Sequence, residues 1–461
     1  MLYMLHPLSF ALLGLSFLLL RRLNSRASQQ RPSLGTWAEL DAVGASPVNK
    51  VSFFGAVARS VVSTPDFVNE GYRRYSKGFA RPFVLPTTWM RGGAVMVLPP
   101  SLVPLLTRPD KMSACEWRNI YGLVENIQLP YGTQAEWETI NGWEACGRVI
   151  SRSSQRILFG LPLSRDEALL ETSRNYATSL LVGGAIINCF PPPVRWLAGP
   201  IVALRAKYFQ SRFVKVLEPV VEERIRQWGA DEDGGPDDFL QWLIPICAKE
   251  GPSQLDARRI ALRLVSLLIP LIFAICYVFA HCVFDILGSP ARSDVLAGLE
   301  EECTRVFAQH TTGLASSEAI NELFRVDSAL RESMRMSGVS VTNLFRDVAT
   351  GELDNIHLDP DDYENPQEYD ALRFSRPFED AKGRVEEREL VTTTTPTFLP
   401  FSYGRHACPG RWFAAQVMKQ ALAYIVQNYN VELVGEVVKR MALVNAIVPP
   451  VNTQIKIQRK K

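Results

Sequence analysis

The amino-acid sequence predicts a mainly α-helical protein with a small β-sheet, built as a single domain behind an N-terminal membrane anchor. The helical expectation comes from apolar residues that recur every three or four positions over most of the chain. The sheet is expected from two runs of alternating apolar and polar residues near the C-terminus, one starting at Tyr429 and one around Ile455. The helical pattern is clearest over Ala145 to Ala177, Val202 to Trp228, Leu255 to Leu287, Ser293 to Gln309 and Trp412 to Tyr429.

Composition narrows the class of protein. The 461 residues are 47% hydrophobic and 21% charged, close to globular averages, so disorder and a polytopic membrane protein are poor fits. Fifty basic and forty-eight acidic residues give a net charge of +2, which leaves no electrostatic footprint for nucleic acid. The eight cysteines form no Cys-x-x-Cys pair, and we expect most of them to be buried free thiols.

The N-terminus has the pattern of a membrane anchor. Leu2 to Leu20 is a largely apolar stretch of 19 residues, close to the length of a helix that spans a bilayer. Arginines follow it at 21, 22, 26 and 31, and positive charge on that side places the rest of the chain in the cytosol. We therefore expect a transmembrane anchor over residues 1–22 and a catalytic domain over 23–461. The alternative is an amphipathic or mitochondrial presequence.

A second apolar run, Leu267 to Phe284, is long enough to resemble another span. It contains Pro270 and His281, and Asp285 follows it directly. A helix that is apolar on all sides is buried either in a large protein or in a membrane. We favour a buried central helix, in which His281 is an ordinary helix residue and not a ligand.

The segment Phe401 to Phe413, FSYGRHACPGRWF, places Cys408 on a glycine-rich loop at the start of a helix. A helix N-terminus and loop N–H groups stabilise a thiolate. Gly404 and Gly410 allow turns and a close approach of the backbone to a flat ligand. Arg405, His406 and Arg411 supply cationic donors for carboxylates such as haem propionates.

This loop resembles the haem-binding loop of the cytochrome P450 superfamily, Phe-x-x-Gly-x-Arg-x-Cys-x-Gly. Phe401, Gly404, Cys408 and Gly410 match it, and His406 stands at the usual arginine position, as in fungal members with a GRHACPGR variant. The resemblance implies the cytochrome P450 fold and haem b, with Cys408 as the axial thiolate ligand of the iron. Thiolate ligation favours O–O cleavage. Further segments are similar to the fungal secondary-metabolism branch, in which ent-kaurene oxidase is a comparable member.

Two further segments support the resemblance. Glu332 and Arg335 match the Glu-x-x-Arg motif of the family, and the segment Tyr363 to Phe374 resembles the one that ends in Arg-Phe. By the resemblance, Glu332, Arg335 and Arg373 form a buried charge network that braces the proximal side of the haem. Their role is structural, because buried ions need mutual pairing. For His357 the resemblance implies packing or hydrogen bonding.

The central helix departs from the family pattern. The family carries an acid or histidine followed by threonine, which relay protons to bound oxygen. Aligned with the family, this chain has Phe273 and Ala274 at those positions, and neither side chain can pass a proton. Pro270, one turn earlier, is expected to preserve the helix distortion found there, since proline removes an intrahelical hydrogen bond.

Two other segments are shorter than the family pattern. Between Tyr121 and Gln134 the chain lacks room for the distal-side helix, and Trp117 and Arg118 are candidate substitutes for its haem contacts. Between Arg346 and Tyr363 a strand pair that lines the substrate pocket looks truncated. Such losses fit mispredicted exons, a decaying gene product or a haem protein with changed chemistry.

The resemblance implies a haem-thiolate monooxygenase that oxidises a small lipophilic secondary metabolite of terpenoid or alkaloid-like class. Electrons would come from an NADPH-dependent reductase on the same membrane, and a single-pass anchor would place the enzyme at the endoplasmic reticulum. Two alternatives stay open. One is a haem protein without normal O2 activation, performing rearrangement, dehydration or peroxide-driven chemistry. The other is a non-catalytic truncated remnant that binds the membrane and incorporates no haem.

Overall fold

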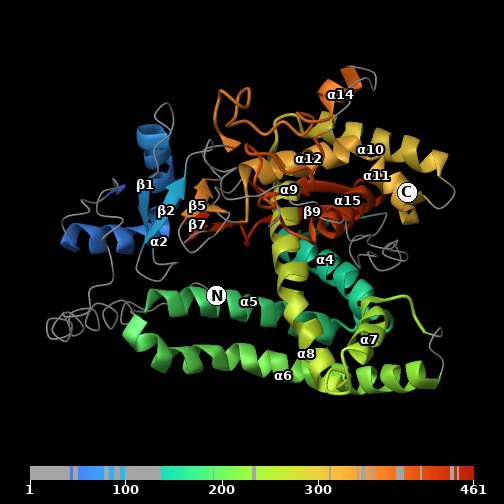
Figure 1. Cartoon of the computed structure of the whole chain (residues 1–461). Coiled ribbons are helices and arrows are strands. Elements are labelled where there is room, and N and C mark those ends of the chain that lie inside the picture. Colours follow the sequence, from blue (N-terminus) through green and yellow to red (C-terminus); the bar gives the residue numbers. More distant parts are fainter. Residues whose placement is uncertain are drawn as a thin grey trace.

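The structure is a computed structural model. A long helical segment, called the central rod below, runs through the middle of the protein (Figure 1). The residues it describes are 42–44, 50–76, 83–87, 94–98, 136–190, 192–230, 235–310, 313–339, 342–343, 349–352, 357–380, 389–404, 407–436, 441–443 and 446–460. The expected anchor over residues 1–22, together with Trp117 and Arg118, lies outside them.

The central rod consists of α8 (Ala257–Leu268), a π-helical turn η6 (Ile269–Ala274) and α9 (Ile275–Gly288). Twelve of the fourteen residues of α9 are buried, and Asp256 caps α8 by accepting the N–H of Arg259. Within the described residues, Ala257–Gly288 is long and apolar enough to cross a membrane, but 67% of its most apolar window is buried inside the protein. The prediction of a buried central helix is therefore confirmed.

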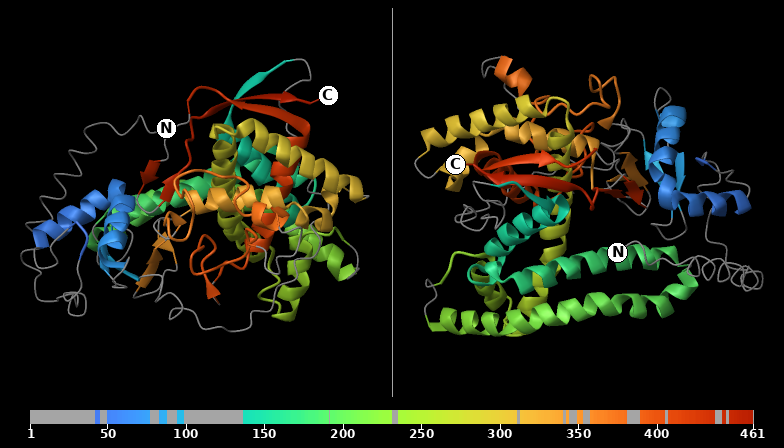
Figure 2. Two further views of the ribbon diagram at one scale, coloured as in Figure 1. Left: turned by 90° about the horizontal axis from the view of Figure 1, so that it is seen from above. Right: turned by 180° about the vertical axis from the view of Figure 1, so that it is seen from behind.

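The other helices surround this rod. They are α2 (Lys50–Gly71), α4 (Gly142–Phe159), α5 (Glu167–Cys189), α6 (Pro192–Ala230), α7 (Phe239–Lys249), α10 (Arg292–Gln309), α11 (Ser317–Asn321), α12 (Phe324–Met336), α14 (Arg376–Asp380) and α15 (Arg411–Asn428), with short turns η3 (Tyr72–Ser76), η5 (Leu163–Arg165) and η7 (Gly313–Ala315). Two of them, α5 and α6, lie side by side as an extended pair at one end of the molecule (Figure 2).

The strands form three small sheets. Strands β1 (Phe83–Pro86), β2 (Ala94–Leu98), β5 (Ala349–Glu352) and β4 (Thr342–Asn343) make the first, in that order, with β2 parallel to β5. Strands β3 (Glu138–Asn141), β9 (Gln454–Arg459) and β6 (Tyr429–Leu433) make an antiparallel second sheet. A hairpin of β7 (Met441–Leu443) and β8 (Ala446–Val448) is the third. The two alternating runs near the C-terminus are β6 and β9, as predicted.

Two large hydrophobic cores hold most of the helices, and a smaller one packs α2 against β1. The larger one joins α4, α9, α10, α12 and α15, and the second joins α6, α7 and α8 with parts of α4 and α5. Leu271, in the π-helical turn, packs against both. The central rod thus connects the cores, because its first half lies in one and its second half in the other.

The helical pattern predicted over Ala145 to Ala177 is two helices in the structure. Gly160 ends α4 with a φ of +71°, a left-handed conformation that suits glycine. Asp166 then starts α5 by accepting the N–H groups of Ala168 and Leu169. Apolar spacing is similar on both sides of this corner, so periodicity alone does not reveal it.

Candidate functional site

Cys408 lies in a tight loop that leads into α15. Its N–H donates to the carbonyl of Phe401 at 2.7 Å, and the N–H of Ala407 donates to the carbonyl of Gly404 at 3.0 Å. Gly404 has a φ of +65°, which lets the chain reverse here. The helix begins at Arg411, so Cys408 lies at its N-terminus with a half-buried thiol. Partial positive charge at that end of the helix favours negative sulfur.

The loop also has a cationic neighbour. Arg411 donates from Nη1 to the carbonyl of Cys408 at 3.0 Å, and its guanidinium lies 3.5 Å from the centre of the Trp412 ring. Burial lowers the pKa of Arg411, and the charge of Cys408 acts in the opposite direction. Its Nε is buried without a hydrogen-bond partner among the described residues.

The structure brings four of the six predicted site residues together in this one turn: Phe401, Gly404, Cys408 and Gly410. A Cβ on Gly410 would lie 3.9 Å from the sulfur of Cys408, so this glycine faces the thiol. The other two residues, Arg405 and His406, lie outside the described part of the chain.

A buried charge network lies on α12. Glu332 accepts from Arg335 at 2.7 and 2.8 Å and from Nε of Arg373 at 3.1 Å, and the side chains of Glu332 and Arg335 are fully buried. Arg335 also donates to the backbone carbonyls of His357 and Pro366. The three residues predicted to pair are therefore in contact, and they tie α12 to the segments that precede the Cys408 loop.

His357 joins the network to the loop region. Its Nε2 accepts the N–H of Leu399 at 3.0 Å, two residues before Phe401. Burial, together with the positive charges of Arg335 and Arg331, lowers the pKa of His357 to about 3. The ring is therefore neutral at physiological pH and serves as a hydrogen-bond acceptor, which agrees with the predicted role.

Sequence reasoning missed two other buried contacts. Arg331 has its guanidinium 3.7 Å from the ring centre of Phe398 and donates to the carbonyls of Leu390 and Thr393. Asp327 on α12 pairs with Lys419 on α15 at 3.3 Å, and both side chains are 5% exposed. A lone arginine or lysine in a helix gives no signal of a distant partner, so nothing in the sequence pointed to them.

The predicted distortion of the central helix is present at Pro270. The helix widens to π geometry over Ile269–Ala274, and Ser154 on α4 donates to the carbonyl of Leu271 at 2.9 Å. Phe273 lies one turn before Tyr277, with 5.2 Å between their ring centres. The hydroxyl of Tyr277 is buried and has no hydrogen-bond partner among the described residues.

The donor set around Cys408 fits a haem. No group of three or more His, Cys, Asp and Glu side chains able to hold a metal occurs in the described part of the chain. The thiol of Cys408 suits an iron whose other ligands come from a porphyrin, and the glycines at 404 and 410 allow a flat ring to approach the loop.

Comparison with known proteins decides the family. The family profile described as Cytochrome P450 matches residues 122–457. The chain belongs to the cytochrome P450 family. This cytochrome P450 therefore carries the haem-thiolate iron cofactor of its family and is by family a monooxygenase.

Two similar proteins come from fungi. Cytochrome P450 monooxygenase gloP of Glarea lozoyensis is 33% identical over 368 residues, which cover 72% of this chain and 67% of gloP. Cytochrome P450 monooxygenase htyF of Aspergillus rugulosus is 30% identical, covering 81% of this chain and 65% of htyF. This P450 thus matches about two thirds of the length of these relatives. Both relatives are named as cytochrome P450 monooxygenases.

A solved structure confirms the fold. The crystal structure of the cytochrome P450DA heme domain matches with a TM-score of 0.63 at 14% identity, covering 92% of this chain and 98% of that one. The predicted fold class, a mainly helical P450 fold with a small sheet, is therefore confirmed.

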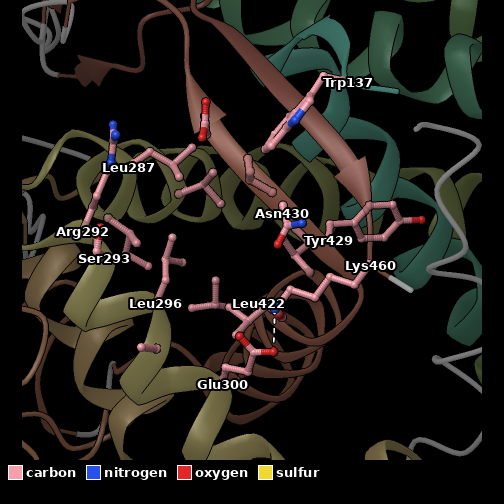
Figure 3. A pocket seen from close by; sticks show the side chains of 17 residues that line it. Trp137, Leu287, Arg292, Ser293, Leu296, Glu300, Leu422, Tyr429, Asn430 and Lys460 are labelled. Atoms are coloured by element: carbon pink, nitrogen blue, oxygen red, sulfur yellow. Dashed lines mark hydrogen bonds and ion pairs between the residues drawn. The ribbon is translucent and has the colours of Figure 1, made fainter. Parts of the chain in front are cut away.

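A surface pocket of about 380 Å³ lies elsewhere in this P450 (Figure 3). Its lining includes Trp137, Leu287, Leu296 and Leu422, and an ion pair between Lys460 and Glu300 at 2.6 Å crosses its edge. Leu422 lies eleven residues beyond Arg411, the first residue of α15, which corresponds to roughly 16 Å along the helix. The pocket is therefore separate from the candidate haem site.

Proposed function

We propose that this P450 inserts one oxygen atom into a small lipophilic secondary metabolite of terpenoid or alkaloid-like class. The observation that carries the proposal is the Cys408 loop: a half-buried thiol held by backbone hydrogen bonds at the N-terminus of α15. Its fungal relatives are named as cytochrome P450 monooxygenases, which supports the reaction type.

In this proposal the thiolate of Cys408 would bind the haem iron. Phe401, Gly404 and Gly410 would hold the loop in shape around the sulfur, while Arg405 and His406 would bind the propionates. A haem bound through a thiolate supplies the capacity to activate O2 and cleave its O–O bond. The chain's own contribution would be to present the Cys408 sulfur at the N-terminus of α15, on a loop fixed by backbone hydrogen bonds.

In the π-helical turn, Phe273 and Ala274 would line the substrate side of the pocket. Both side chains are half-buried and neither carries a hydroxyl or acid. An apolar wall of this kind excludes water and accommodates a lipophilic substrate. It also favours a second candidate function, a haem protein that does not activate O2 in the normal way, because the chain has no proton donor at these two positions.

We further propose that residues 1–22 anchor the catalytic domain, 23–461, to the membrane of the endoplasmic reticulum. The apolar stretch followed by arginines supports a single-pass anchor with the domain in the cytosol. An NADPH-dependent reductase on the same membrane would then supply electrons.

The decisive experiment is an absorbance difference spectrum of the reduced, haem-loaded protein exposed to carbon monoxide. A strongly red-shifted Soret band is expected for a thiolate-bound iron, and Cys408→His should replace it with the band of a neutral ligand. Cys303→Ser, a buried thiol on α10, is the matched control and should keep the shifted band. If the unsubstituted protein binds no haem, the enzyme proposal falls and the truncated remnant takes its place.

A further inference from the structure

The surface pocket of Figure 3 has the size of a small-molecule site. Its volume of about 380 Å³ lies within the range of such sites, which runs from about 300 to 1,000 Å³. The pocket lies where the end of α9, the first half of α10, the end of α15 and strand β6 meet. None of the residues that line it belongs to the Cys408 loop, so the candidate haem site does not account for it.

The most buried part of the pocket lining is apolar. It consists of side chains from α9 and α15 that are only 1–6% exposed: Val283, Ile286, Leu287, Leu422 and Val426. Covering apolar surface of this kind releases it from water, which is the main favourable term in binding an apolar ligand. The inner end of the pocket therefore favours a ligand with an apolar body.

One wall of the pocket is an aromatic ring. Trp137, directly before β3, is 41% exposed, and its indole lies on the far side of the pocket from Leu296 of α10 (Figure 3). Aromatic rings pair favourably in offset-stacked or edge-to-face arrangements, beyond the gain from burial alone. A ligand that carries a ring would use this wall.

The charged side chains of the lining cancel one another. Arg292 and Lys460 are basic, and the ammonium of Lys460 is held by the carboxylate of Glu300 at 2.6 Å and the carbonyl of Val426 at 2.8 Å. Glu432 supplies the second acidic group, and it is exposed, as is Arg292. Burial of an ion is costly unless an opposite charge pairs with it. A lining without net charge therefore favours an uncharged ligand.

Asn430 supplies a polar group at the rim. It is exposed on β6, and its side-chain nitrogen donates to the side-chain oxygen of Gln458 at 3.4 Å. Its own side-chain oxygen accepts no hydrogen bond from a described residue. That oxygen can accept from a hydroxyl group of a ligand. Small-molecule sites commonly combine an apolar interior with a few polar groups of this kind, which fix the orientation of the ligand.

We propose that this pocket binds a small uncharged alcohol whose apolar body carries a ring. The body would lie on the buried side chains of α9 and α15, the ring against Trp137, and the hydroxyl would donate to Asn430. Because the ligand would contact α9, α10 and α15 together, its binding should stabilise the folded chain. The site goes beyond the proposed oxidation and does not depend on haem.

The test is a titration of the full chain, labelled with 5-fluorotryptophan, with the uncharged alcohol 2-naphthalenemethanol. The ¹⁹F NMR signal of Trp137, assigned by its loss in Trp137→Phe, should shift and saturate both in the haem-loaded and in the haem-free protein. The Soret band reports separately on ligand bound near the iron, so failure of the proposed oxidation leaves this test intact. A Trp137 signal that stays in place up to the solubility limit of the alcohol would overturn the proposal.

Two substitutions on α10 locate the ligand. Ala297 lines the pocket and is exposed, so Ala297→Phe places a ring in the pocket without disturbing the core. It should raise the Kd of the alcohol by roughly tenfold or more, as expected when the burial of an aromatic ring is lost. Ala308→Phe, at an exposed position of the same helix outside the pocket, is the matched control and should leave the Kd unchanged. An equal Kd in both variants would contradict the assignment to this pocket.

Related compounds test the chemical class of the ligand. The anion 2-naphthoate and the cation 2-naphthylmethylamine carry the same rings, and each should bind roughly tenfold more weakly than the alcohol. Tighter binding of either ion would overturn the assignment to an uncharged ligand. Asn430→Ala should weaken binding of the alcohol but not of 2-methylnaphthalene, which has no hydroxyl. Equal weakening of both compounds would exclude Asn430 as the hydrogen-bond acceptor.

Discussion

At the scale of single residues, His357 is a neutral hydrogen-bond acceptor that fixes the segment leading into the Cys408 loop. Its Nε2 receives the N–H of Leu399, and its own carbonyl receives Arg335. A protonated ring could not accept the Leu399 bond, and the added charge would be buried beside two arginines. The hydrogen bond from Leu399 therefore requires that the His357 ring stay unprotonated in the folded state.

The first prediction concerns pH. The pKa of His357 is about 3 in the folded state and near 6.5 when unfolded, so between these values the unfolded chain binds the extra proton. Stability contributed by the neutral ring is therefore fully present above pH 6.5 and falls as the pH drops toward 3. Between pH 7.5 and pH 5, the free energy of unfolding measured with urea should fall less for His357→Gln than for the unsubstituted protein. Glutamine keeps a hydrogen-bond acceptor but cannot titrate. Equal losses in both proteins would exclude His357 as the source.

A second prediction concerns Ala274. If oxygen activation is limited by the missing hydroxyl, Ala274→Thr should raise reductase-driven product formation, by roughly 10²–10⁴-fold if it restores general acid catalysis. Peroxide-driven turnover should change much less. If the protein instead performs chemistry without O2 activation, the variant leaves its turnover unchanged. Steady-state rates with each oxidant separate the two candidate functions, and Ala274→Val, with a similar shape and no hydroxyl, is the control.

At the scale of elements, α12 supports the Cys408 loop region through buried ion pairs. Its Glu332 balances two arginines, Arg335 within the helix and Arg373 beyond it, and Asp327 adds the pair to Lys419 on α15. Such buried pairs add little net stability when intact, but losing one partner leaves a charge without compensation. The cost of a change should therefore appear as lost stability.

Replacing Glu332 by Gln should lower the free energy of unfolding by about 3–5 kcal/mol, because the buried Arg335 and the partly buried Arg373 lose their counter-charge. The control is Glu223→Gln, which breaks the ion pair with Arg226 between side chains that are 43% and 77% exposed. That change should cost far less stability, because solvent screens an exposed ion pair. Chemical denaturation measures both, and similar losses for the two variants would contradict a buried brace.

What the sequence could predict also differs by element. The Cys408 loop was predictable, because its glycines and the helix that follows are local features. The π-helical turn was expected from Pro270, since proline cannot complete the hydrogen-bond ladder. The break between α4 and α5 at Gly160 was not expected, because the spacing of apolar residues is the same on both sides of it. The contacts of Arg331 and the Asp327–Lys419 pair join distant segments, and such partners are set by tertiary packing alone.

At the scale of the whole molecule, the central rod joins the two large hydrophobic cores. Its α8 half lies in the core with α6 and α7, its α9 half in the core with α12 and α15, and Leu271 contacts both. Helix α15, which follows the cysteine loop, contributes many residues to the larger core. A ligand held by Cys408 should therefore stabilise the molecule globally.

The last prediction follows from this connection. Haem that binds only the folded chain should raise the free energy of unfolding by about 2.7 kcal/mol when it is in hundredfold excess over its Kd. The urea midpoint, followed by far-UV circular dichroism, should rise on loading without a large change in slope, because the same core is exposed in both cases. Cys408→Ala should lose most of this shift, while its haem-free midpoint stays close to that of the unsubstituted protein, since the thiol is only half-buried. A haem-free midpoint that falls as far as the loaded one would mean that Cys408 supports the fold and not the cofactor.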